Sequence, residues 1–271
     1  MNNAFDEIQQ SAKALKIDIY ATDVANFIKD KEYDTRQLAA IAEILKHLRD
    51  RKEESIISTL LKMSRLPLKE PKTFQGFDFG YIRSKDVDKL KSLPTLATLH
   101  SNRNLAFIGP QGVGKTHLAM AYGRECCLQG YKTYFLKATE LNQRFTEAIK
   151  YGREGSVVNG LVKPSCLIVD EIGRCVFNKE NTRLFFDMVD RRYSKEGPNS
   201  MVFTSNLMPS QWCEYFNEDE SLRCALDRIF DDAVVYVIKG DSYRGKNLET
   251  YSITTAAAKN KCKRLITGCL P

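Results

Sequence analysis

The sequence predicts an α/β fold with a five-stranded parallel sheet, preceded by a small all-helical region. Between residues 104 and 239, five short β-rich runs alternate with helical stretches, a pattern typical of a parallel sheet covered by helices. The first run leads directly into a glycine-rich loop and a helix, whereas the first seventy residues lack glycine and have helical periodicity. The expected strands cover residues 105–108, 132–136, 166–169, 201–204 and 233–238.

The amino-terminal region is expected to form three helices, over residues 5–16, 22–29 and about 35–63. Two prolines then fall within residues 66–72, and because proline interrupts helices this run predicts a linker. The expected organisation is a helical module for partner or DNA interaction at 1–66, a linker at 67–80, the α/β domain at 81–240 and a short basic segment at 241–271.

Residues 109–116 match the pattern G-x-x-x-x-G-K-[ST], in which backbone N–H groups and a lysine surround the phosphates of a nucleoside triphosphate. The helix N-terminus favours an anion, and the Thr116 hydroxyl is a ligand for Mg²⁺. We therefore expect ATP or GTP with Mg²⁺ here; the alternative is a plain glycine turn before a helix. The expected nucleotide contacts are Gly109, Pro110, Gln111, Gly112, Val113, Gly114, Lys115, Thr116 and His117.

A second set of polar residues follows two of the later strands. Asp170 and Glu171 end an apolar run, and we expect Asp170 to hold Mg²⁺ and Glu171 to polarise the attacking water. Asn206 follows the fourth strand and is the expected sensor of the γ-phosphate. The structural alternatives are a buried strand with exposed acids at its end, and an asparagine that makes a turn.

Two arginines, Arg228 and Arg244, come well after these motifs. An arginine from a neighbouring subunit can stabilise charge on a transferring phosphoryl group, and we assign this role to Arg228. A surface ion pair with Asp227, Asp231 or Asp232 is its alternative. For Arg244 a nucleotide contact and a surface ion pair both stay open.

The formal net charge of +7 permits an anionic partner without naming one. Residues 239–264 hold seven basic and two acidic residues, which fits either a contact with a phosphate backbone or a solvated tail. Residues 150–153 could likewise present a basic loop to DNA, or simply end an amphipathic helix.

Cysteine usage and the start of the chain predict a cytoplasmic protein. No apolar stretch reaches the length of a membrane span, and residues 1–19 lack the basic and apolar segments of a signal peptide. The eight cysteines show no C-x-x-C spacing and are interpreted as reduced, buried side chains, and the three histidines lack the spacing of zinc ligands.

Taken in order, the motifs resemble those of the IstB-like transposition helper ATPases, relatives of the DnaC-type helicase loaders. They are Gly-Pro-Gln-Gly-Val-Gly-Lys-Thr-His-Leu-Ala, Val-Asp-Glu-Ile-Gly, Thr-Ser-Asn-Leu with Trp212 nearby, Leu-Asp-Arg and Gly-Asp-Ser-Tyr-Arg. The resemblance covers nearly the whole chain. It implies an AAA+ ATPase domain, ATP-dependent self-assembly on duplex target DNA, and delivery of that DNA to the transposase of the same element.

Carried onto this chain, the resemblance gives the same roles to the phosphate loop, Asp170, Glu171 and Asn206, and it matches Arg228 to the arginine finger. Arg244 falls on the signature arginine near the end. Arg174 departs from the family, which commonly has an aromatic residue there. The residues after Lys239 are also too few for a complete helical lid.

The competing hypothesis, which the same ATPase motifs allow, is that the protein is a DnaC-like replicative helicase loader. Its amino-terminal module would then bind a helicase. A phosphate-loop kinase acting on a small molecule is disfavoured by Glu171, Asn206 and the late arginines. A further alternative is a scaffold that binds nucleotide without hydrolysing it, but such a protein would not need Glu171 to activate water.

Overall fold

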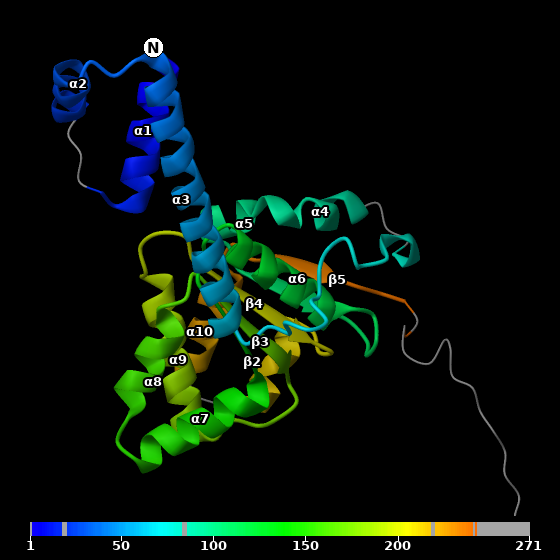
Figure 1. Cartoon of the computed structure of the whole chain (residues 1–271). Helices are drawn as coiled ribbons and strands as arrows, with labels where there is room; N and C mark the ends of the chain where they lie inside the picture. Colours follow the sequence, from blue (N-terminus) through cyan, green and yellow to red (C-terminus); the bar gives the residue numbers. More distant parts are fainter. Residues whose placement is uncertain (1, 18–20, 83–85, 218–219, 241, 243–271) are drawn as a thin grey trace, which may run out of the picture.

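Five parallel strands form the central sheet of the computed structural model, which describes residues 2–17, 21–82, 86–217, 220–240 and 242 (Figure 1). The strand order is β2-β3-β4-β1-β5, so the first strand in sequence lies between the last two. The strands are β1 (Leu105–Ile108), β2 (Thr133–Lys137), β3 (Cys166–Ile172), β4 (Ser200–Ser205) and β5 (Val234–Val237).

Helices cover both faces of the sheet because successive strand residues point to opposite sides. In β1, Leu105 and Phe107 pack in the core on the side of α6 (Lys115–Leu128), whereas Ala106 and Ile108 pack in the core on the other side. All four are buried, as expected of an inner parallel strand. Four short helices accompany the α6 layer: η1 (Phe79–Tyr81), α4 (Val87–Lys91), η2 (Leu93–Thr95) and α5 (Ala97–His100). The opposite layer contains α7 (Ala138–Lys150), α8 (Glu154–Val162), α9 (Lys179–Tyr193), η3 (Pro209–Tyr215) and α10 (Glu220–Phe230).

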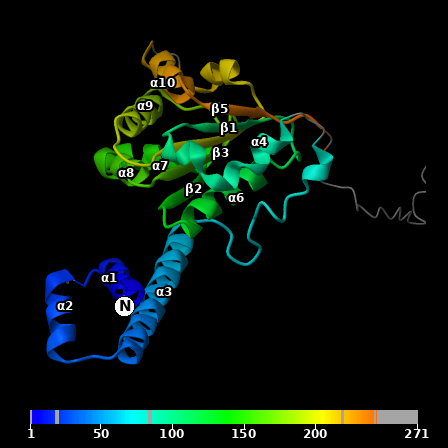
Figure 2. The same ribbon diagram turned by 90° about the horizontal axis from the view of Figure 1, so that it is seen from above.

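The three helices predicted before the sheet are confirmed as α1 (Asn2–Leu15), α2 (Ala21–Asp30) and α3 (Thr35–Met63). A capping box between Asp34 and Gln37 fixes the start of α3, whose bounds match the prediction. A small core that includes Ile8, Leu38 and Ala42 joins α1 to α3. Figure 2 shows α1, α2 and the first part of α3 projecting away from the sheet.

The carboxyl end of α3 is anchored on the outer strand of the sheet. The Ser64 carbonyl accepts a hydrogen bond of 2.9 Å from the Phe135 N–H on β2. Arg65 forms an ion pair of 3.0 Å with Glu140 on α7, and Leu66 is buried in the α6 layer. The projecting helices are therefore fixed to β2 and α7.

The five predicted strands are all present, and the largest difference is in β3, which continues three residues beyond the predicted end. In β3, Val169 pairs with Phe203 and Ile172 with Ser205, so Asp170 and Glu171 together lie opposite one residue of β4. This irregularity is a β-bulge, which extends the strand through the two acids. In the described ranges, no helix is both long and apolar enough to cross a membrane.

Candidate nucleotide site

The phosphate loop connects β1 to α6, as the sequence predicts, and neighbouring segments pack closely against it. Gly112 (φ +83°) lies against Ser242, and Gly114 (φ +93°) lies against the ring of Phe77. A side chain at either glycine would meet these neighbours and would also adopt an unfavourable left-handed backbone. The two glycines therefore let both flanking segments approach the loop.

Lys115 extends across the loop and meets the residue after β4. Its ammonium donates hydrogen bonds to the carbonyls of Gly109 (2.8 Å) and Pro110 (2.6 Å) and to the side-chain oxygen of Asn206 (2.8 Å). Because β1 and β4 pair directly, the residues that follow them are neighbours in space. The structure thus brings together two of the predicted site residues.

Thr116 and Asp170 are joined in the same region. The Thr116 hydroxyl donates to Asp170 Oδ1 at 2.7 Å, and the Thr204 hydroxyl donates to the same oxygen at 2.6 Å. Asp170 is 2% exposed. Burial raises the pKa of its carboxyl, while the hydrogen bonds from Thr204 and Thr116 oppose this shift. A hydroxyl beside a carboxylate is a set of hard oxygen ligands that fits Mg²⁺.

Thr204 is a site residue that the sequence analysis missed. Besides its bond to Asp170, its hydroxyl accepts a hydrogen bond of 2.9 Å from the Glu171 N–H. One hydroxyl therefore fixes both acids of the bulge. The available signal was its place two residues before Asn206, near the end of the strand whose carboxyl end the sequence analysis assigned to the site.

Glu171 has a left-handed backbone (φ +61°), which is uncommon for a residue other than glycine. Its carboxylate forms an ion pair with Arg174 Nη1 at 2.7 Å and another with Lys137 Nζ at 3.8 Å. Arg174, the departure from the family pattern, thus contacts the expected water-activating residue. Such a bulge redirects side chains at the end of a strand.

His117 contacts the segment that precedes the α/β region. Its Nε2 lies 2.8 Å from the Thr73 carbonyl oxygen, and its ring packs edge-on against Phe77 at 5.3 Å. Phe74 and Phe77 are both buried in the α6 layer. These contacts hold the segment before the sheet beside the phosphate loop.

Arg228 lies near the amino ends of the strands, whereas the phosphate loop of its own chain lies at their carboxyl ends. The next residue, Ile229, accepts a hydrogen bond from Asn104, which immediately precedes β1, whereas the loop follows β1. The Arg228 guanidinium pairs with Asp190 at 2.8 Å and lies 5.5 Å from the ring of Phe186. Its ion-pair partner is thus on α9 and is not one of the three aspartates considered from the sequence. Arg244 and the basic residues that follow it lie outside the described residues.

Arg192, a second residue that the sequence analysis missed, has a structural role. It is fully buried, and burial lowers its pKa to about 10. Its guanidinium donates to the carbonyls of Leu161 (2.9 Å) and Pro164 (2.9 Å) and to the side-chain oxygen of Asn199 (2.6 Å). It therefore binds the carboxyl end of α8 to the segment that precedes β4.

The interpretation of the cysteines as free, buried side chains holds for the three in the core, whereas Cys175 and Cys213 are free but only partly buried. Cys126, Cys127 and Cys166 are free and fully buried, and burial raises the pKa of both Cys126 and Cys127. Within the described part of the chain, no group of three histidine, cysteine, aspartate or glutamate residues could hold a metal ion.

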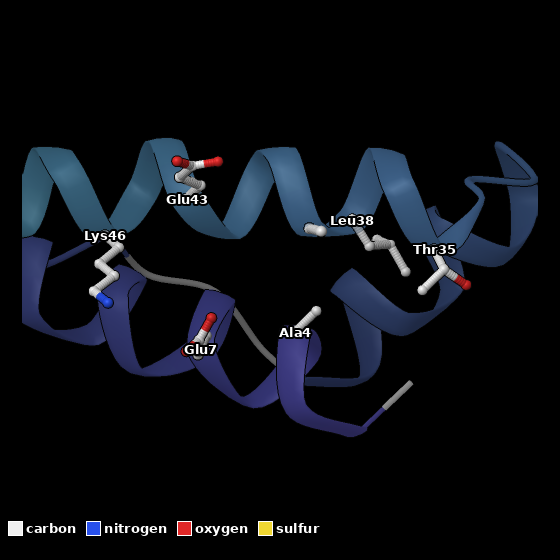
Figure 3. Close-up of a pocket in the computed structure, with 7 residues that line it drawn as sticks. Ala4, Glu7, Thr35, Leu38, Glu43 and Lys46 are labelled. Atoms are coloured by element: carbon white, nitrogen blue, oxygen red, sulfur yellow. The ribbon is translucent and has the colours of Figure 1, made fainter.

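A groove of about 500 Å³ lies between α1 and α3, away from the phosphate loop (Figure 3). Ala4 and Leu38 lie toward one end of it with Thr35, and the charged side chains Glu7, Glu43 and Lys46 lie toward the other end. Its lining consists of Ala4, Glu7, Thr35, Leu38, Ala39, Glu43 and Lys46.

Two insertion-sequence proteins are similar to this chain over most of their length. An ATP-binding protein of insertion sequence IS232 from Bacillus thuringiensis subsp. berliner is 30% identical over 250 residues, which cover 91% of this chain and 97% of that protein. An ATP-binding protein of insertion sequence IS5376 from Geobacillus stearothermophilus is 35% identical over 193 residues, or 71% and 75% of the two chains.

Solved structures with the same fold include DnaA and DnaC. AMPPCP-bound DnaA from Aquifex aeolicus has a TM-score of 0.53 at 22% identity, over 66% of this chain and 52% of DnaA, so this chain spans about half of DnaA. The DnaC helicase loader has a TM-score of 0.51 at 16% identity, over 62% of this chain and 97% of DnaC. The fold is therefore that of the AAA+ phosphate-loop proteins. A family model, IstB-like ATP binding protein, matches residues 10–250, and the chain belongs to this family.

Proposed function

We propose that this protein is an ATP-dependent, DNA-binding transposition helper that self-assembles on duplex target DNA and recruits or stimulates the transposase of the same element. The observation that carries the proposal is the meeting of Lys115, Asn206, Thr116 and Asp170 at one edge of the sheet in an IstB-like protein. The similar proteins named above belong to insertion sequences, which supports a role in transposition.

The chemistry we propose is hydrolysis of ATP to ADP and phosphate. The loop amides and Lys115 would bind the β- and γ-phosphates, and Thr116 and Asp170 would hold Mg²⁺, which supplies positive charge against the phosphate oxygens. Glu171 would orient the water that attacks the γ-phosphorus, and Asn206 would fix the γ-phosphate and that water. The bond between the γ-phosphorus and the bridging oxygen breaks, and ADP leaves.

The position of Arg228 supports an active site shared between subunits. Because it lies near the start of β1, whereas its own phosphate loop follows the end of β1, we infer that it acts on the nucleotide of a neighbouring subunit. An arginine supplied in this way stabilises the transition-state charge. To serve as a finger it must leave Asp190, with which it forms a partly exposed ion pair.

A DNA contact is proposed for the exposed loop between α7 and α8. Tyr151 is 62% exposed, with the Lys150 ammonium 5.4 Å and the Arg153 guanidinium 6.0 Å from its ring centroid. Cations beside an exposed aromatic ring offer both phosphate contacts and a stacking surface. A DnaA structure of the same fold contains single-stranded DNA, which supports DNA as the partner class.

The likeness to DnaC favours a second candidate function, that of a replicative helicase loader. Both functions would use the same nucleotide site and would differ in what the helices α1 to α3 bind. Co-purification with a hexameric helicase would favour the loader. A neighbouring gene for an integrase-like transposase would favour the transposition helper.

The proposal is tested by DNA binding in different nucleotide states. A helper controlled by ATP must bind DNA with different affinity in its ATP and ADP states. A ligand with equal affinity for two states does not shift the equilibrium between them. We expect duplex DNA to bind more tightly, and the protein to sediment as a larger assembly, with a non-hydrolysable ATP analogue than with ADP. Equal DNA affinity with both nucleotides would overturn the proposal.

A further inference from the structure

The Arg228 guanidinium rests on one face of α9. It forms an ion pair of 2.8 Å with Asp190 Oδ1, and it lies 5.5 Å from the ring centroid of Phe186 and 6.0 Å from that of Tyr193. These three residues follow one another at intervals of four and three along α9, so they share one side of the helix. A carboxylate and the faces of aromatic rings all attract a guanidinium. Phe186, Asp190 and Tyr193 together are called the α9 cradle below.

The guanidinium can leave the α9 cradle without any movement of α10. On either side of Arg228, Leu226 and Ile229 are buried in the same core as Val189 of α9. Apolar packing therefore holds the two helices together, independently of the ion pair. The Arg228 and Asp190 side chains are 35% and 46% exposed, so their contact lies at the surface. Release of the arginine is a change of its side chain alone.

The α9 cradle and the neighbouring nucleotide would compete for the same positive charge. The guanidinium forks onto either a carboxylate or phosphate oxygens, and while it is paired with Asp190 it is not available to a transferring phosphoryl group. The activity that depends on Arg228 is then reduced by the fraction of time that it spends in the cradle. The exposed ring of Tyr193 lies at the same surface, where a docking subunit would meet it.

We propose that Asp190 is a positioning residue that, together with Phe186 and Tyr193, holds Arg228 on its own subunit until assembly brings a neighbour's nucleotide within reach. The inference rests on the proposed function, because it concerns the arginine assigned to the shared site. Exposed ion pairs are weak, so the restraint is a partial one. It raises the protein concentration that ATP turnover requires, since assembly has to draw the arginine out of the cradle.

The test measures ATP turnover on duplex DNA over a range of protein concentrations for wild type and Asp190→Asn, which keeps the shape of the side chain but removes its charge. We expect half-maximal turnover of the variant at an about two- to fivefold lower protein concentration, the range that an ion pair of this exposure supports. Affinity for a labelled ATP analogue should stay unchanged. Asp187→Asn is the matched control, since Asp187 pairs with Arg191 at 2.7 Å on the same helix and its loss should leave the curve in place.

A double variant separates release of the arginine from a general effect on assembly. In the Arg228→Ala background, the change Asp190→Asn should give no gain, because the group to be released is missing. A gain that persists without Arg228 would overturn the inference. An unchanged or higher protein requirement for Asp190→Asn alone would do the same, as would a lower maximal rate, which would mean that Asp190 holds the guanidinium in its working position.

Failure of the restraint can be told apart from failure of the proposed function. If wild-type turnover depends on Arg228 and Asp190→Asn shows no gain, only the restraint fails. If Arg228→Ala hydrolyses ATP as wild type does, or if wild type does not hydrolyse ATP at all, both the restraint and the shared active site fail.

Discussion

The side-chain oxygen of Asn206 accepts a hydrogen bond of 2.8 Å from the Lys115 ammonium, so the residue after β4 is tied to the phosphate loop after β1. Direct parallel pairing of the two strands makes this contact possible, because it places their carboxyl ends side by side. An amide group is thereby held next to the lysine that we assign to the γ-phosphate.

Replacement of Asn206 by alanine is expected to lower the rate of ATP hydrolysis by about 100-fold, the usual effect of removing one preorganised polar group from a transition state. Nucleotide affinity should change little, because the loop amides and Lys115 are retained. Single-turnover kinetics and a titration with labelled ATP analogue measure the two quantities separately. A loss of affinity with an unchanged rate of hydrolysis would assign Asn206 to ground-state binding only.

Replacement of Glu171 by glutamine should lower the rate of ATP turnover by about 100-fold or more, because the amide cannot accept a proton from the attacking water. Binding of ATP should persist. Glu147→Gln on α7 is a matched control, since Glu147 is an exposed glutamate whose carboxylate accepts a hydrogen bond from Gln143 on the same helix. Unchanged turnover in Glu171→Gln would favour a nucleotide-binding scaffold.

Asp170 is expected to make stability depend on pH. Burial raises its pKa, so the folded protein binds a proton more readily than the unfolded chain does, and the unfolding free energy falls as pH rises from the ordinary aspartate pKa to the raised value. Asp170→Asn removes the cost of a buried charge. We expect it to raise the melting temperature at pH 7 in the absence of Mg²⁺ and to remove the Mg²⁺ dependence of nucleotide affinity. A lower melting temperature would contradict this account.

Two adjacent arginines on α9 should differ greatly in their effect on stability. Arg192→Ala removes the group that donates to the buried Leu161 carbonyl and to the buried side-chain oxygen of Asn199, and we expect a loss of about 3 kcal/mol or more in the unfolding free energy. Arg191→Ala removes an exposed ion pair and should cost about 0.5 kcal/mol or less. Urea denaturation measures both, and similar losses for the two variants would show that Arg192 is not the structural link described.

Much of the fold could be predicted from the sequence because its signals are local. The strands are short apolar runs, α3 has a capping box at Asp34, and the phosphate loop is a contiguous motif. The strand order could not be predicted, because it depends on pairing between distant segments. The continuation of β3 through Glu171 also escaped prediction, since the bulge is set by the register between β3 and β4 and by the hydrogen bond from the Glu171 N–H to the Thr204 hydroxyl.

In the candidate site, too, some residues could be predicted from the sequence and others could not. Residues within motifs, such as Lys115 and Asp170, were predicted by their spacing. The partners that fix them were not predicted, because Thr204 comes from another strand and carries no motif of its own. The sequence marked Arg174 as a departure from the family, but only the turn after β3 shows that it meets Glu171.

The central claim, an ATPase site completed by a neighbouring subunit, is tested most directly by mixing two inactive variants on duplex DNA. Arg228→Ala keeps its own phosphate loop and Glu171 but lacks the arginine, whereas Glu171→Gln keeps the arginine but lacks the water-orienting carboxylate. We expect each variant alone to bind ATP without turning it over, and the mixture to recover turnover wherever the two kinds of subunit meet. A mixture no more active than the sum of its parts, or Arg228→Ala with wild-type turnover, would contradict the account.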